Sequence, residues 1–233
     1  MCLAMHWELN YIASGVEAKM SKRMGPRGEH LRRAVAQEAA RIMSEHGIDD
    51  YGLAKRKAAE RLGATDIAVL PKNAEIEAAL ADHHRLFEYN THSSTLTDLR
   101  RTALQAMRLL HKFQPRLVGP VLSGTASAHS EVNLHLFAEA PESVALHLME
   151  NNVPHHIAER RLRYEPDRLV QYPVVQFVAG NRPIDAVVFP VNGIRQSPAS
   201  PVDGRPMRRA DSNELESLLS DQREAHAEGV LRD

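Results

Sequence analysis

The stretch VGPVLSGTASAHSEVNLHLF, residues 118–137, decides the fold because it joins two contrasting patterns. Its first half contains Gly119 and Gly124, which are typical of a turn where the backbone must bend sharply or pack closely. Its second half alternates polar and apolar residues from Glu131 to Leu136, the period of a β-strand with one buried face. We therefore expect a strand, a glycine loop and a second strand here.

Four amphipathic helices are expected ahead of this stretch. Between Glu29 and His46, apolar residues recur at helical spacing, and Gly47 follows where a helix C-cap belongs. Thr95 and Asp98 resemble a capping box at the start of the fourth helix. The expected helices cover residues 29–46, 51–62, 73–88 and 95–113.

The period of the sequence changes after Pro115, where short runs rich in β-branched and large apolar residues begin. Residues 141–152 predict a helix between the second and third of these runs, and residues 179–182 predict a hairpin turn between the last two. A loop rich in proline and glycine at 197–206 leads to a final helix near 211–219. The expected strands cover residues 117–122, 130–138, 160–164, 174–178 and 184–189.

Helices followed by strands predict an α+β fold, with one core of ordinary size and a helical extension. The expected parts are a tail without regular structure at residues 1–28, a helical region at 29–113, a small mixed-sheet domain at 114–191, and a loop with a C-terminal helix at 192–233.

Charge and cysteine content narrow the classes of partner. The 233 residues include 29 Lys and Arg against 30 Asp and Glu, so no overall field favours nucleic acid or a membrane surface. The single cysteine, Cys2, cannot form an internal disulfide, and no apolar run approaches the roughly 20 residues of a membrane span. These features favour a cytoplasmic protein, and we expect any bound polyanion to be held locally.

Residues 118–137 as a whole resemble the glycine loop and metal-binding strand of the nucleotidyltransferase superfamily, the DNA polymerase β-like or minimal nucleotidyltransferase fold. The resemblance implies that Gly119, Gly124, Thr125 and Ser130 contact a nucleoside triphosphate. It further implies transfer of a nucleoside monophosphate from that triphosphate to a hydroxyl acceptor, with Mg²⁺ bridging the phosphates. The residues on matching positions are Gly119, Gly124, Thr125, Ser130, Val132 and Leu134.

The acidic positions of this motif are partly replaced. By the resemblance, the catalytic residues are Glu131 at the first acidic position, Asn133 at the second, and Asp185 on the last strand at the third. Glu131 and Asp185 are the expected metal ligands, because an amide supplies a neutral oxygen where a carboxylate would supply a charge. Pro120 replaces the serine that would touch phosphate, and proline has no backbone N–H to offer.

Two functions from different classes follow from this motif. One is a Mg²⁺-dependent nucleotidyltransferase. The other is a catalytically inactive descendant that keeps the fold as a binding or regulatory module, which Asn133 and Pro120 favour. On the residues alone, the glycine loop could also be a plain turn, or a P-loop that lacks its phosphate-binding lysine.

Other charged and titratable residues have a structural expectation beside a functional one. His135, in the middle of a strand, is expected to be packed or partly exposed, with a metal ligand or a base as the alternative. The arginines at 160–163 and 205–209 are expected to form solvated basic faces, and phosphate is the ligand that either group would suit.

Overall fold

The structure, a computed structural model, describes residues 25–64, 66, 69–87 and 89–230. Most of the tail expected at residues 1–28 therefore lies outside the described residues. Within the described part, Pro26 already belongs to the first helix, ahead of the expected start at Glu29. Proline suits the first turn of a helix because its missing N–H would have no partner there.

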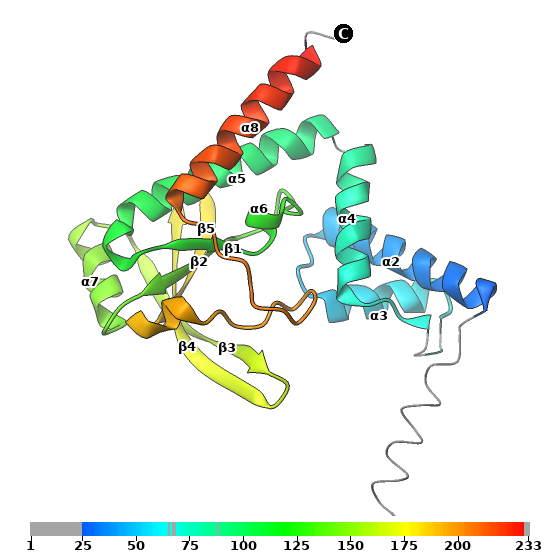
Figure 1. The fold of residues 1–233 in the computed structure, drawn as a ribbon, viewed down its shortest axis with the longest axis horizontal. Coiled ribbons are helices and arrows are strands. Elements are labelled where there is room, and N and C mark those ends of the chain that lie inside the picture. The colour runs from blue at the N-terminus through cyan, green and yellow to red at the C-terminus, as the bar shows by residue number, and fades with distance from the viewer. Residues whose placement is uncertain (1–24, 65, 67–68, 88, 231–233) are drawn as a thin grey trace, which may run out of the picture.

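Three helices form a small unit at the beginning of the described chain, drawn in blue and cyan in Figure 1. Val35 of α2 and Ile76 of α4 are fully buried between them. Gly47 adopts the left-handed conformation, with φ of 62°, and ends α2 as expected. The helices are α2 (Pro26–His46), α3 (Tyr51–Arg61) and α4 (Asn73–Phe87).

The fourth helix, α5 (Tyr89–Leu109), shares its core with the sheet that follows rather than with the first three helices. Leu99, Ala103 and Met107 of α5 are fully buried in the same cluster as the strands. The core of the sheet unit thus begins well before residue 114. The capping box expected at Thr95 does not form, because the helix starts earlier and Thr95 lies inside it.

Five strands form one mixed sheet in the order β1-β2-β5-β4-β3. The neighbours β2 and β5 run parallel, and every other neighbouring pair is antiparallel. Together with the helices, this sheet confirms the expected α+β class. The strands are β1 (Arg116–Val118), β2 (Val132–Phe137), β3 (His155–Glu165), β4 (Arg168–Ala179) and β5 (Arg182–Phe189).

The segment after β1 is a short helix and not a continuing strand. Gly119 and Gly124, with φ of 73° and 89°, flank α6 (Pro120–Ser123) in a backbone conformation that other residues rarely adopt. The strand expected at 117–122 therefore ends at Val118. Pro120 explains the difference, because it suits the first turn of a helix and cannot donate to a strand ladder.

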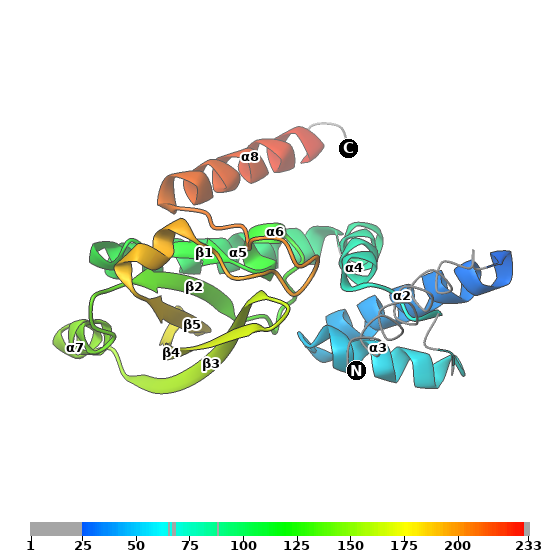
Figure 2. The same cartoon turned by 60° about the horizontal axis from the view of Figure 1, so that its bottom comes forward.

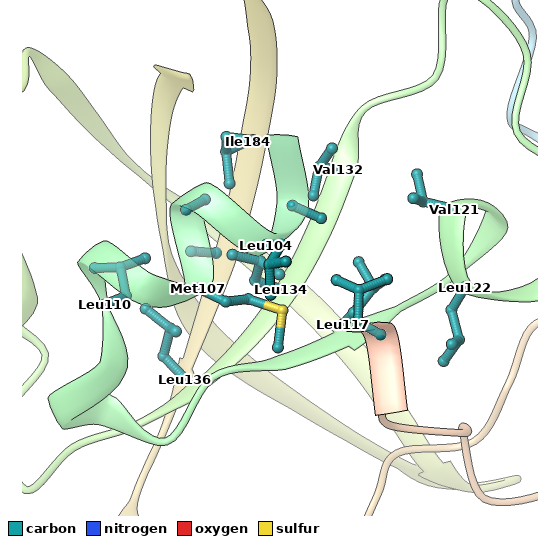
Figure 3. Close-up of a cluster of buried hydrophobic side chains, with 14 of the residues drawn as sticks. Leu104, Met107, Leu110, Leu117, Val121, Leu122, Val132, Leu134, Leu136 and Ile184 are labelled. Atoms are coloured by element: carbon teal, nitrogen blue, oxygen red, sulfur yellow. The ribbon is translucent and has the colours of Figure 1, made fainter. Parts of the chain in front are cut away.

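One face of the sheet packs against α5 to form the main core, as Figure 3 shows for Met107 beside the side chains of β2. Leu134, Leu136 and Ile184 are fully buried on this face. Since successive side chains of a strand point to opposite faces, the residues between them lie on the other face. That second face, called the polar face below, carries Asn133, His135 and Phe137 of β2 and Asp185, Val187 and Phe189 of β5.

The remaining connections place the late part of the chain over the polar face. The hairpin turn between β4 and β5 forms as expected, with positive φ at Gly180 and Asn181. After β5, the 3-10 helix Val191–Arg195 begins a long segment that ends on β1, where Ala210 pairs with Leu117. Between β2 and β3 lies the expected helix, α7 (Glu142–Glu150).

The last helix, α8 (Ser212–Val230), is longer than expected and packs beside α5, as both views show (Figures 1 and 2). Leu215 and Leu219 of α8 are buried in the main core. Among the described residues, no helix combines the length and the apolar character that crossing a membrane requires.

Candidate functional site

Asp185 lies at the centre of the polar face, where it is paired with Asn133 across the parallel strands β2 and β5. Its side chain is only 3% exposed. Its carboxylate accepts hydrogen bonds from the guanidinium of Arg160 on β3 and, at 2.9 Å, from Nε2 of Gln176 on β4. The fold therefore brings Asn133 and Asp185 together. It also places the positively charged guanidinium of Arg160 against the Asp185 carboxylate.

Arg160 joins these two residues through one guanidinium group. One terminal nitrogen donates to Oδ1 of Asn133 at 3.2 Å, while the other forms an ion pair with Asp185. A guanidinium is planar and always charged, so it can satisfy several oxygens at once as a fixed cation. Arginine in this position supplies the positive charge that the buried carboxylate needs.

Glu131, directly before β2, lies close enough to Asp185 for the two carboxyl groups to interact. Burial raises the pKa of Glu131, the neighbouring charge of Asp185 raises it further, and the charge of Arg160 opposes both effects. The two expected metal ligands thus share one location. Within the described part of the chain, no group of three or more His, Cys, Asp and Glu side chains is placed to hold a metal ion.

The glycine loop packs on Asn133 through its first residue. A Cβ atom added to Gly119 would lie 3.6 Å from Nδ2 of Asn133, so Gly119 packs directly over the amide. Gly124 ends α6, and Arg100 of α5 donates to the carbonyl oxygens of Val121 and Leu122 at 3.1 and 3.3 Å. Arg100 therefore stabilises the end of this short helix rather than facing a ligand.

Thr125 is bound to the helical unit. Its hydroxyl donates to Oε1 of Glu77 on α4 at 2.8 Å, and the hydroxyl of Ser123 donates to the same oxygen at 3.2 Å. The hydroxyl of Tyr51 bonds to the other oxygen of Glu77. A carboxylate thus accepts from the Thr125 hydroxyl, which the resemblance assigns to a triphosphate.

Ser130 has a structural contact inside the loop. It is 3% exposed, and its hydroxyl oxygen accepts a hydrogen bond from the backbone N–H of Ser127 at 3.0 Å. Of the four residues expected to bind nucleotide, Gly119 therefore lies beside Asn133. Gly124, Thr125 and Ser130 instead hold the loop in shape or attach it to the helical unit.

His135 is packed, as expected, and it has a defined neighbour. Nε of Arg209 donates to Nδ1 of His135 at 3.0 Å, and the His135 ring is 2% exposed. Burial lowers the pKa of His135 to about 3, and the charges of Arg209 and Arg160 lower it in the same direction. Because Nδ1 accepts from an arginine, the neutral ring carries its proton on Nε2.

Arg209 fixes the late segment of the chain to the polar face. One of its terminal nitrogens donates to the carbonyl oxygens of Gly193 and Ile194 at 2.9 and 3.2 Å. Its guanidinium carbon lies 5.0 Å from the ring centre of Phe137 and 5.1 Å from that of Phe189. Arg209 is therefore a packed residue, and the solvated basic face expected at 205–209 does not include it.

A cavity of about 620 Å³ lies over the polar face. Asn133, His135 and Arg160 belong to its lining, and residues 199–207 of the late segment form another wall. A volume of this size falls within the range of roughly 300–1,000 Å³ that is common for small-molecule sites. The candidate site is thus a cavity whose lining includes the neutral His135 ring and Arg160, the ion-pair partner of Asp185.

The lowered pKa of His135 predicts a pH dependence of stability. Between pH 6.5 and about pH 3, the His135 ring is protonated in the unfolded chain but stays neutral in the folded chain. The free energy of unfolding is therefore unaffected by this ring above pH 6.5 and decreases as the pH falls below that value. From pH 7 to pH 5, urea unfolding should show the native chain losing about 2 kcal/mol more than a His135→Asn variant, which cannot titrate. Equal losses in both would contradict a buried neutral ring.

The sequence pattern missed Glu77 and Gln176, and it placed Arg209 in a basic group without indicating its contact with His135. Gln176 carried a signal, because a polar residue interrupts the apolar run VVQFV at a position that faces Asp185 across β4 and β5. Glu77 and Arg209 lie far along the chain from the residues they bind, and no local pattern marks these two contacts.

In comparisons with known proteins, no family model, no curated protein and no solved structure matches this chain.

Proposed function

We propose that this chain is a non-catalytic binding module with a nucleotidyltransferase-like fold, in which an arginine takes the position of the metal. The observation that carries the proposal is the guanidinium of Arg160, which bonds to both Asp185 and Asn133. These are two of the three positions from which the resemblance would recruit metal ligands. A fixed cation there repels a divalent ion and uses the oxygens that the ion would need.

The residues present therefore do not fit Mg²⁺ well. Hard divalent cations select charged oxygen ligands, and here Asn133 offers an amide while the charge of Asp185 is already balanced by Arg160. Glu131 is left as the other carboxylate, and a single carboxylate is a weak site for a divalent cation. We derive no catalytic step through a metal from this arrangement.

The loop supports the same proposal from the nucleotide side. The hydroxyls of Thr125 and Ser123 both donate hydrogen bonds to the carboxylate of Glu77, so they already have a negatively charged acceptor. A triphosphate brought to this loop would meet like charge and would have to break both hydrogen bonds. In this proposal the module acts in the cytoplasm, and its ligand is held on the polar face without a metal.

The competing function, a Mg²⁺-dependent nucleotidyltransferase, draws on the proximity of Glu131 and Asp185. Calorimetric titration of the full chain with ATP, with and without Mg²⁺, separates the two functions. We expect no Mg²⁺-dependent binding at millimolar nucleotide. Mg²⁺-dependent binding that disappears in Asp185→Ala, but persists in the exposed control Asp203→Ala, would overturn the proposal.

A further inference from the structure

The cavity over the polar face contains a hydrogen-bond donor that the protein itself does not use. His135 lines the cavity, and its Nδ1 is occupied by Arg209. The proton of the neutral ring is therefore on Nε2, where no described residue forms a hydrogen bond with it. His135 is 2% exposed as a whole residue, but its Nε2 is not a fully buried atom, so an acceptor placed in the cavity can take this hydrogen bond.

A positive charge stands directly behind this donor. Arg209 is half-buried, and its hydrogen bonds go to neutral acceptors: the His135 ring and the carbonyl oxygens of Gly193 and Ile194. No acidic side chain of the described residues forms an ion pair with Arg209, and its remaining terminal nitrogen is buried without a hydrogen-bond partner. A hydrogen bond from such a polarised ring is strongest to an anion.

The rest of the cavity favours an apolar ligand body with a negative group. No aspartate or glutamate belongs to its lining, Arg160 does belong to it, and Arg209 lies directly behind His135, so a negative group of a ligand meets no like charge at the wall. Most of the other walls are apolar, among them Leu162, Leu169, Val187, Pro201 and Met207. A ligand that fills this space buries an apolar surface and brings its own acceptor.

We propose that this cavity binds an amphipathic organic anion, with a carboxylate or phosphate accepting from Nε2 of His135 and an apolar ring system against Leu162, Val187 and Met207. The inference rests on the proposed function in one respect, that the polar face binds a ligand without a metal. It adds the ligand class and the residue that orients it.

The test uses three probes with one ring system and different head groups: 2-naphthoate, 2-naphthyl phosphate and the neutral 2-naphthamide. Each is titrated into the full chain by calorimetry in the presence of EDTA. We expect at least one of the two anions to bind at least tenfold more tightly than the amide, and the preferred anion tells a carboxylate ligand from a phosphate ligand. Equal affinity for all three probes, or no binding of either anion at millimolar concentration, would overturn the proposal.

Two sets of variants locate the binding. His135→Asn keeps an acceptor for Arg209 but removes the Nε2 donor, and it should weaken the preferred anion at least tenfold. Leu169 is 56% exposed at the cavity, so Leu169→Asp adds a negative charge without opening the core. We expect Leu169→Asp to weaken the anion more than Leu169→Asn does, and the matched Val178→Asp, outside the cavity, to have no effect. If all four variants bind the anion as tightly as the native chain does, the ligand binds elsewhere and the proposal is wrong.

The two proposals fail separately. Mg²⁺-dependent ATP binding through Asp185 would remove the proposed function whatever the naphthyl probes do. Failure of the naphthyl anions in EDTA, with no metal-dependent nucleotide binding, would remove only the ligand class.

Discussion

Replacing Arg160 with methionine is expected to lower the free energy of unfolding by about 3 kcal/mol. The reason lies in Asp185, whose side chain is 3% exposed and would keep the hydrogen bond from Gln176 but lose its cation. A buried carboxylate that loses its cation costs far more than an exposed ion pair is worth. Urea unfolding at neutral pH, followed by circular dichroism, measures the change.

The neighbouring Arg161 supplies the matched control. It lies on the same strand, is exposed, and contacts Gln171 at 3.4 Å rather than a carboxylate. Arg161→Met should therefore change the free energy of unfolding by less than about 0.5 kcal/mol. If the two variants lose the same amount, Arg160 has no special role in balancing Asp185.

The second large effect is expected at Arg209. Arg209→Met should lower the free energy of unfolding by about 2–3 kcal/mol, because it removes the hydrogen bond to His135, two bonds to carbonyl oxygens and the contacts with two aromatic rings. It should also raise the pKa of His135 from its value of about 3, since the charge of Arg209 contributes to the lowering after burial. Urea unfolding and NMR titration of the His135 ring report these two effects independently.

A variant at Arg205, on the same late segment, separates the effect of losing packed contacts from the effect of losing a positive charge. Its side chain is 85% exposed, so Arg205→Met removes one positive charge without removing buried contacts. We expect little change in stability and no change in the titration of His135. An unchanged His135 pKa in Arg209→Met would instead show that burial alone keeps the ring neutral.

Much of the fold could be predicted because periodicity is a local property. The glycines at 119 and 124 marked a turn, and the alternation after Ser130 marked a strand whose polar residues share one face. The errors occurred where a local pattern had two solutions. Pro120 can end a strand or begin a helix, and Thr95 can cap a helix or lie within it, and in both cases tertiary packing decides.

The candidate site could be predicted only in part. The proximity of Asn133 and Asp185 follows from two strands running side by side, and the motif anticipated it. The partner of Asp185 did not follow, because Arg160 looked like one of several exposed arginines on a strand. Its role depends on the strand order, in which β4 separates β3 from β5. The long side chain of Arg160 on β3 reaches across β4 to Asp185 on β5. Likewise, Glu77 meets Thr125 only because the helical unit packs on the loop.

Thermal unfolding with and without Mg²⁺, for the native chain and for Arg160→Met, tests most directly whether an arginine stands in for the metal. A ligand that binds the folded state raises its melting temperature, so the shift reports metal binding. We predict no shift for the native chain at millimolar Mg²⁺, and a clear rise for Arg160→Met, where Glu131 and Asp185 become free to bind the ion. A rise in the native chain that equals the rise in the variant, and that is lost in Asp185→Ala, would contradict the account.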